Sequence, residues 1–148
     1  MSRAKRIEPV QDIAEDKEKK LAVSVVGFER RVTEAETKLQ ELERYRLEYQ
    51  QQYTVRAGRG MSVTDLRDYQ AFLARLNDAV KQQQALVQRA GVERDAERLR
   101  WQEAARKAKA LDHVIGKWKT EERRVEDKRE QRDTDERAQR AKREDFLK

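Results

Sequence analysis

The sequence has no cysteine, and its 148 residues include one proline, one histidine and five glycines. Without cysteine there is no disulfide framework and no thiolate metal site. The single histidine, His113, has no second histidine with which to share a metal ion. So few helix breakers cannot separate many short elements, and the composition therefore favours long helices.

Long apolar runs are also missing, so no segment is expected to span a membrane. Residues 1–6 include three basic side chains but are not followed by the apolar core of a signal peptide. We therefore expect a cytoplasmic protein, and the lack of cysteine is compatible with a reducing compartment.

Charge dominates what is present, because 43% of the residues are Asp, Glu, Lys or Arg and only 36% are hydrophobic. This balance argues against a thick globular core. The 35 basic and 29 acidic residues leave a net charge of only +6, which argues against disorder driven by charge repulsion. The basic excess is also too thinly spread to form a stripe for nucleic acid.

Apolar residues recur on a heptad pattern from residue 7 onward, in alternating steps of four and three that define the seam of a coiled coil. This pattern predicts a first helix over about residues 7–56. One heptad position reads Ile7, Ala14, Leu21, Phe28, Ala35, Leu42 and Tyr49, and the other reads Val25, Val32, Leu39, Arg46 and Tyr53.

A turn is predicted over residues 57–62, where Gly58 and Gly60 offer the positive φ that a reversal between helices needs. Ser62 then has the position of an N-cap. Asp65, three residues later, is placed to interact with the free N–H groups of the first helical turn.

A second helix is predicted over about residues 63–145. Its seam reads Leu66, Leu73, Val80, Val87, Arg94, Trp101, Ala108 and Ile115 at one position, and Tyr69, Leu76, Gln83, Ala90, Glu97, Ala104, Leu111, Trp118 and Val125 at the other. Folding back at the turn pairs residues whose numbers add to about 121. The charged tail, 126–148, lies beyond this pairing, and its stretch 126–145 has no large apolar residue. The fold expected for residues 1–148 is a single domain: an all-α, antiparallel two-helix coiled-coil hairpin with an overhanging C-terminal helix.

Catalysis is not expected on such a hairpin. Gly58 and Gly60 do not form a phosphate loop, because no strand precedes them and no Gly-Lys-Ser/Thr ending follows. Acidic pairs such as Glu121 and Glu122 lie on a charged helix surface without a cavity that would raise a carboxyl pKa. We predict that the chain is not an enzyme and needs no cofactor or metal.

Aromatic residues cluster on both sides of the turn. Tyr45, Tyr49 and Tyr53 precede it, and Tyr69 and Phe72 follow it. Two helices cannot hide all five rings in one seam. One interpretation is a wide seam that stabilises this end of the hairpin, and the other is a protein-binding surface, since exposed aromatics beside aliphatics are typical of binding hot spots.

Residues 42–49 (LERYRLEY) and 66–76 (LRDYQAFLARL) together resemble the bacterial flagellar export protein family FliJ. The resemblance covers most of the chain. It implies a non-catalytic, cytoplasmic component of flagellar type III protein export at the inner membrane. The implied fold is similar to the rotor stalk of rotary ATPases, and the implied partners are a hexameric export ATPase ring, the cytoplasmic domain of the export gate protein, and export chaperones.

The resemblance also implies which residues bind. The gate would contact an aromatic patch that consists of Leu42, Tyr45, Tyr49, Phe72, Leu76 and Ala79. Lys38 and Gln83 flank it, but family members often have Gln and His there, so these two positions are doubtful. The helix ends, 7–21 and 115–125, would be the parts inserted in the ring, an assignment from topology alone.

Two rival functions remain open from the sequence. The equivalent stalk of a virulence injectisome would share the hairpin and serve another secretion machine. A basic coiled-coil protein that binds nucleic acid is supported by the pI of about 9.6 and opposed by the interleaved acidic residues. The salt dependence of binding would distinguish this second rival.

Overall fold

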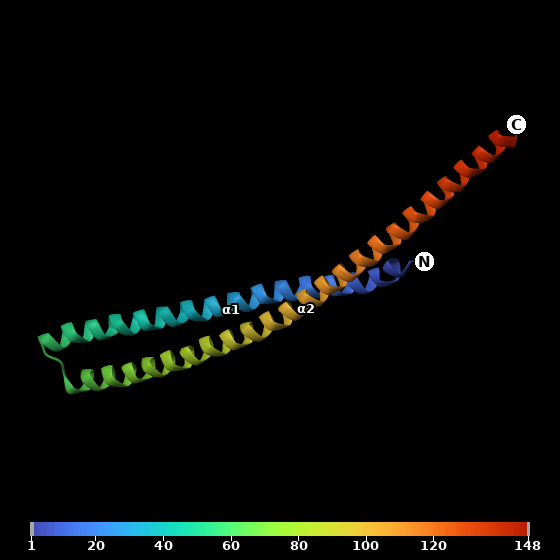
Figure 1. Ribbon diagram of the computed structural model, residues 1–148. Coiled ribbons are helices and arrows are strands. Elements are labelled where there is room, and N and C mark those ends of the chain that lie inside the picture. The colour runs from blue at the N-terminus through green and yellow to red at the C-terminus, as the bar shows by residue number, and fades with distance from the viewer. Residues whose placement is uncertain (1, 148) are drawn as a thin grey trace. The chain divides into compact units, whose positions relative to one another are not determined.

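The computed structural model describes residues 2–147, and within this range the chain forms two helices and no strand. Helix α1 spans Arg3–Arg59 and helix α2 spans Val63–Leu147 (Figure 1). The predicted all-α hairpin of two long helices is confirmed. The chain divides into two compact units, Lys20–Gln102 and a second unit made of 2–19 with 103–147.

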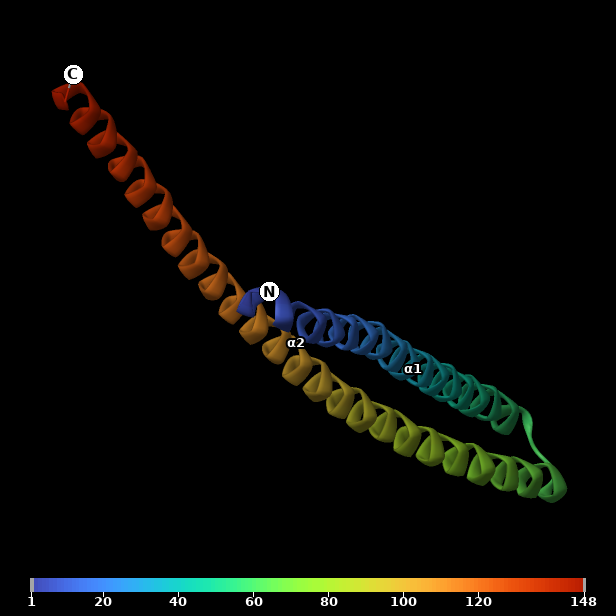
Figure 2. The ribbon, with the colours of Figure 1, turned by 90° about the vertical axis from the view of Figure 1, so that its right-hand side faces the viewer.

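The unit Lys20–Gln102 contains the turn and the antiparallel segments on both sides of it, which lie side by side in both views (Figures 1 and 2). Ser62 caps α2 as predicted, because its Oγ accepts a hydrogen bond from the backbone N–H of Asp65 at 3.1 Å. The N–H of Leu66 donates to the Ser62 carbonyl at 3.0 Å and closes the first helical turn.

Only one of the two turn glycines has the conformation expected of it. Gly60 has a φ of +97°, which a residue with a side chain rarely adopts, and its N–H donates to the Ala57 carbonyl at 3.2 Å. Gly58 instead lies inside α1 with an ordinary negative φ. The prediction of positive φ at Gly58 is therefore wrong, because capping by Gly60 lets the helix continue to Arg59.

The two glycines should respond oppositely to alanine. Gly60→Ala is expected to destabilise the hairpin by roughly 1 kcal/mol, since a Cβ is strained at this φ. Gly58→Ala is expected to stabilise it by roughly 0.5–1 kcal/mol, since a Cβ there would meet no heavy atom within 4 Å. Urea unfolding followed by circular dichroism measures both. Equal effects of the two substitutions would contradict the assignment of the turn to Gly60.

The seam of this unit is built from branched aliphatic side chains. Val32, Leu76 and Val80 are buried, and the other predicted seam positions between residues 20 and 102 are at least partly covered. Contacts across the seam follow the predicted register: Arg46 Nη1 donates to Asn77 Oδ1 at 3.2 Å, and Tyr49 lies against Phe72. The sums of these residue numbers are close to 121, so the heptad pattern located the seam and the position of the turn located the pairing.

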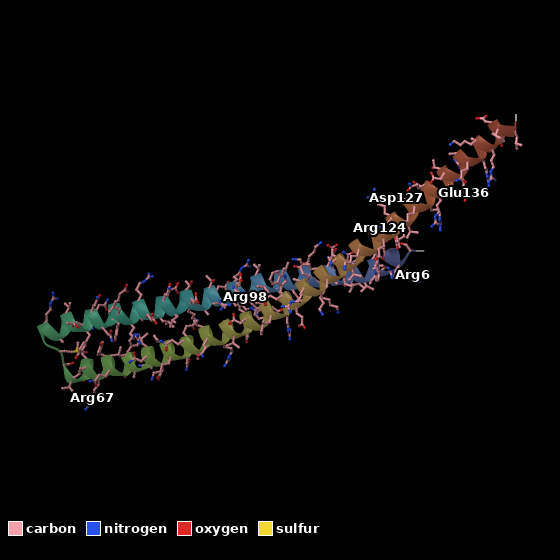
Figure 3. All side chains as sticks on the ribbon, in the orientation of Figure 1. Arg6, Arg67, Arg98, Arg124, Asp127 and Glu136 are labelled. Atoms are coloured by element: carbon pink, nitrogen blue, oxygen red, sulfur yellow. The ribbon has the colours of Figure 1, made fainter. Side chains whose placement is uncertain are left out.

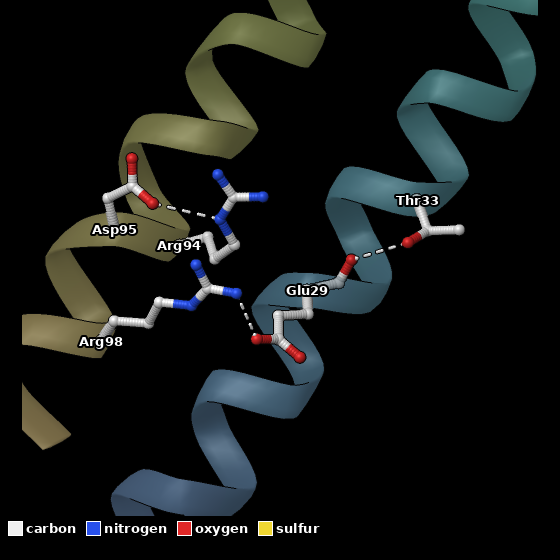
Figure 4. A network of polar contacts seen from close by, with 5 residues as sticks. All are labelled: Glu29, Thr33, Arg94, Asp95 and Arg98. Carbon is white, nitrogen blue, oxygen red and sulfur yellow. Dashed lines mark hydrogen bonds and ion pairs between the residues drawn. The ribbon is translucent and has the colours of Figure 1, made fainter.

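Polar contacts flank the seam between α1 and α2. Arg98 donates through Nη2 to Glu29 Oε1 at 2.7 Å, and Thr33 Oγ1 donates to the Glu29 carbonyl one turn earlier in α1 (Figure 4). On α2, Arg94 is paired with its neighbour Asp95 at 3.2 Å. The side chains of Arg98 and Glu29 are both more than a third exposed, so their pairing contributes at most about 1 kcal/mol and helps chiefly to fix the register.

The second unit pairs the first part of α1 with α2 from residue 103 onward, through a seam of smaller side chains. Its buried apolar residues are Ala4, Ala14, Ala104, Ala108 and Ile115. Alanine-rich seams allow two helices to approach more closely than branched side chains do. Gln11 donates to Asp112 at 2.9 Å, and Lys119 pairs with Glu8 at 3.3 Å, so charged groups line the edges of this seam.

Helix α1 begins at Arg3, four residues before the first heptad residue, for two reasons. Ser2 Oγ accepts a hydrogen bond from the N–H of Lys5 at 3.2 Å. Glu122 of α2 accepts a hydrogen bond from the N–H of Ala4 at 3.4 Å, so a carboxylate from the other helix lies at the positive end of the α1 dipole. The Arg3 guanidinium also lies 4.3 Å above the Trp118 ring.

The last part of α2 has no partner helix within this unit. Every residue from 123 to 147 is exposed, and the labelled side chains of Arg124, Asp127 and Glu136 project from a lone helix (Figure 3). Val125, the last predicted seam residue, is exposed because α1 begins too late to cover it. Acidic and basic residues four apart, such as Asp133 and Arg137, favour helix without burial. The predicted overhanging helix is confirmed, and α2 ends at Leu147.

Candidate partner-binding surface

The candidate surface begins with two rings from different helices. Tyr45 and Phe72 each directly precede a seam residue, Arg46 and Leu73, so each lies on the flank of the seam and not within it. In an antiparallel pair these flanks face the same side. The two ring centroids are 6.1 Å apart with an interplanar angle of 84°, an edge-to-face contact. Both helices therefore contribute to one surface.

The other aromatic rings continue this contact toward the turn. Tyr49 lies between Phe72, at a centroid distance of 4.5 Å, and Tyr69, at 5.1 Å. Tyr69 in turn stacks on Tyr53 at 3.8 Å. The resemblance did not assign Tyr53 and Tyr69 to the patch, and here they are half-buried members of the same ladder. Such stacking fixes the orientation of Tyr49 and Phe72 and thereby prepares a rigid surface.

Partial burial raises the pKa of Tyr69 above its ordinary value, and the neighbouring Tyr53 and Tyr49 add to this rise. The neutral phenol is therefore the form that the folded hairpin favours. In the unfolded chain the hydroxyl ionises at its usual pKa of about 10. The hairpin consequently has its full stability below the pKa of the unfolded chain, and it loses part of that stability as the pH rises through the higher pKa of the folded state.

We therefore expect the melting temperature to fall between about pH 9 and pH 11. Tyr69→Phe should reduce part of this fall, because phenylalanine keeps the stacked ring and has no proton to lose. Thermal melting of both proteins across this range measures the effect. A pH profile of Tyr69→Phe that matches the wild-type profile would show that Tyr69 does not contribute to the alkaline loss.

The six residues of the aromatic patch differ in exposure. Tyr45 is 50% exposed, although it is largely apolar. Leu76 is buried in the seam. The remaining members are half-buried: Leu42, Tyr49, Phe72 and Ala79. The patch is thus partly seam and partly surface, and Tyr45 with the edge of Phe72 is the part most available to a partner.

The two doubtful flanking positions differ from each other. Lys38 is exposed on the same flank as Tyr45. Gln83 is buried, and its Nε2 donates a hydrogen bond to the Ala35 carbonyl across the seam at 2.9 Å. A buried polar side chain bonded across a coiled coil fixes the register of the two helices. We therefore assign Gln83 to the contact between the helices and leave it out of the candidate surface.

Leu86 extends the candidate surface and was missed by the sequence reasoning. It occupies the same heptad flank of α2 as Phe72 and Ala79, one heptad further along, and its side chain is exposed. The signal that could have identified it is this seven-residue spacing, since an apolar residue on an outer flank has no role in the seam.

No cluster of metal-ligating side chains is assembled in the described part of the chain. His113 is exposed, and residues 2–147 contain no group of three metal-ligating side chains. Within the same range no helix is long and apolar enough to cross a membrane.

The fold places the chain in the class of all-α proteins built as an antiparallel hairpin of two long helices. The family model described as "Flagellar FliJ protein" matches residues 3–144, and the chain belongs to this family. It is therefore a component of flagellar type III protein export, as the resemblance implied. No curated protein and no solved structure shows significant similarity to the chain.

Proposed function

We propose that the chain is the central stalk of the flagellar export ATPase ring and that its aromatic patch binds the cytoplasmic domain of the export gate protein. In this function it resides in the cytoplasm, associates with the inner membrane at the flagellar base, and escorts or recycles export chaperones. The helix ends, 7–21 and 115–125, are the segments proposed to enter the ring. No catalytic residue is required of it.

The gate-binding part of the proposal rests on one observation. Tyr45 and Phe72 come from different helices, meet edge to face, and leave Tyr45 half-exposed. Aromatic side chains that are held rigidly and remain accessible are the usual centres of protein-binding hot spots. Family membership favours flagellar export over the injectisome, because the matching model is that of a flagellar protein.

The proposal is tested by binding of the full chain to two purified proteins, the hexameric export ATPase and the cytoplasmic domain of the gate protein. We expect each to be retained by the immobilised chain. Retention of the gate domain alone would overturn the stalk role, and retention of the ATPase alone would overturn the gate contact. Binding that collapses with salt and extends equally to unrelated DNA would instead support the nucleic-acid alternative.

A further inference from the structure

Residues 21–28 of α1 (LAVSVVGF) form the longest uncharged run in the sequence. Leu21, Val25 and Phe28 occupy the seam and are partly covered by α2. Val23 and Val26 lie outside the seam and are 74% and 54% exposed. A helical segment that is apolar on all sides is expected to be covered on all sides, and the hairpin covers only one of them.

The back of α2, meaning the face that points away from α1, also has exposed apolar side chains. On α2, Val92 and Leu99 are 64% and 66% exposed and lie seven residues apart, so they follow one line along the helix. Their heptad position points directly away from α1, as that of Val23 points away from α2. The numbers of Val23 and Leu99 add to 122, which places them at the same level of the unit Lys20–Gln102.

Two glycines within the helices occur at this level as well. A Cβ at Gly27 would meet no heavy atom within 4 Å, and a Cβ at Gly91 would meet only the end of the Arg94 side chain at 3.9 Å. Packing within the hairpin therefore gives no reason for glycine at either position. Glycine weakens a helix but allows another chain to approach the backbone closely.

We propose that Val23, Val26, Val92 and Leu99 form an apolar collar that is enclosed by an opening in a partner assembly. A single docked helix would cover one back of the hairpin, whereas these side chains lie on both backs at one level. The partner of this chemistry is a ring whose opening is lined with apolar side chains. The collar rests on the proposed stalk function, and it extends the ring contact beyond the helix ends.

The charged residues beside the uncharged run indicate which charges the rim of this opening would carry. Arg30 and Arg31 follow the uncharged run on α1 and form its basic flank, and Glu29 beside them is paired with Arg98. Acidic groups at the rim would complement this basic flank and set the depth of insertion. Contact within the opening would be apolar and non-directional, so it needs no fixed ion pairs.

Site-specific photo-crosslinking tests the enclosure. A benzoylphenylalanine is placed singly at Val23 or at Leu99 of the full chain, which is then mixed with the purified hexameric export ATPase and a non-hydrolysable ATP analogue. We expect crosslinks to the ATPase from both positions, and none from Val55, a control near the turn that is also more than half exposed. Crosslinks from only one back, or only to a second copy of this chain, would overturn the collar.

A paired substitution tests its contribution to binding. Val23→Gln with Leu99→Gln is expected to lower the affinity for the ATPase ring at least tenfold with unchanged melting, because both side chains are exposed. Leu47→Gln, which changes a comparably exposed residue outside the collar, should leave binding unchanged.

The outcomes separate the collar from the stalk function. Wild-type affinity in the double variant would overturn the collar and leave the stalk function intact. A marked loss of melting temperature would show that the two side chains are packed within the hairpin, and it would also overturn the collar. Failure of the wild-type chain to bind the ring would overturn both proposals.

Discussion

Val80→Asp is expected to destabilise the hairpin by on the order of 4 kcal/mol, because it places an unpaired carboxylate in the seam and removes a buried apolar side chain. Val80 is 2% exposed and lies at a heptad position that faces α1. A change of this size is a large part of the 5–15 kcal/mol that typically separates folded from unfolded domains. The expected result is that circular dichroism shows a loss of helical signal at room temperature.

Val92→Asp is the matched control, since it makes the same change on the same helix at a residue that is 64% exposed. There the carboxylate stays in water, and a change within about 0.5 kcal/mol is expected. Similar melting of the two variants would mean that the seam does not hold the hairpin together. Ile115→Asp should repeat the Val80 result in the unit that contains the start of α1, where Ile115 is also buried.

Tyr45→Ala is expected to weaken binding to the cytoplasmic domain of the gate protein by about thirtyfold, or roughly 2 kcal/mol, as for a hot-spot residue. The ring is half-exposed, so its removal costs the hairpin little beyond the edge contact with Phe72, about 0.5–1.5 kcal/mol. Calorimetric titration and thermal melting of the same preparations would separate binding from stability.

Leu47→Ala serves as the control for this experiment, because Leu47 is similarly exposed two residues away on another face of α1. Its binding should remain at the wild-type level. Phe72→Ala is a less clean test than Tyr45→Ala, since Phe72 also contacts Tyr49 and its loss disturbs the ladder. If Tyr45→Ala binds the gate domain as the wild type does, the aromatic patch is a seam feature and the gate assignment fails.

Much of the fold could be predicted from the sequence because a coiled coil is specified by local periodicity. The heptad positions named from Ile7 to Trp118 are all at least partly covered, and the exception among the predicted seam residues is Val125. The pairing register followed from the position of the turn, since the loop between two antiparallel helices fixes which residues meet. The N-cap at Ser62 needed only its position before the helix.

The candidate surface could be predicted only in part. Heptad position identified Tyr45 and Phe72 as flanking residues, and it could also have identified Leu86. Position alone could not distinguish Gln83, buried and bonded to Ala35, from a surface glutamine, because a polar residue at a seam position can either remain buried or turn toward water. Whether such a residue is exposed depends on which backbone carbonyl lies opposite it, and that depends on how the two helices pack.

By itself the sequence determined the two helices, their seam and their register, because these depend on spacing along the chain and on one glycine turn. Tertiary structure alone decided the start of α1 at Arg3, where Glu122 lies 118 residues away in sequence and accepts a hydrogen bond from the Ala4 N–H. It likewise decided which of two glycines adopts a positive φ, and it joined five aromatic rings into one ladder. Such features require groups distant along the chain to meet in space, and periodicity contains no information about the atoms that meet.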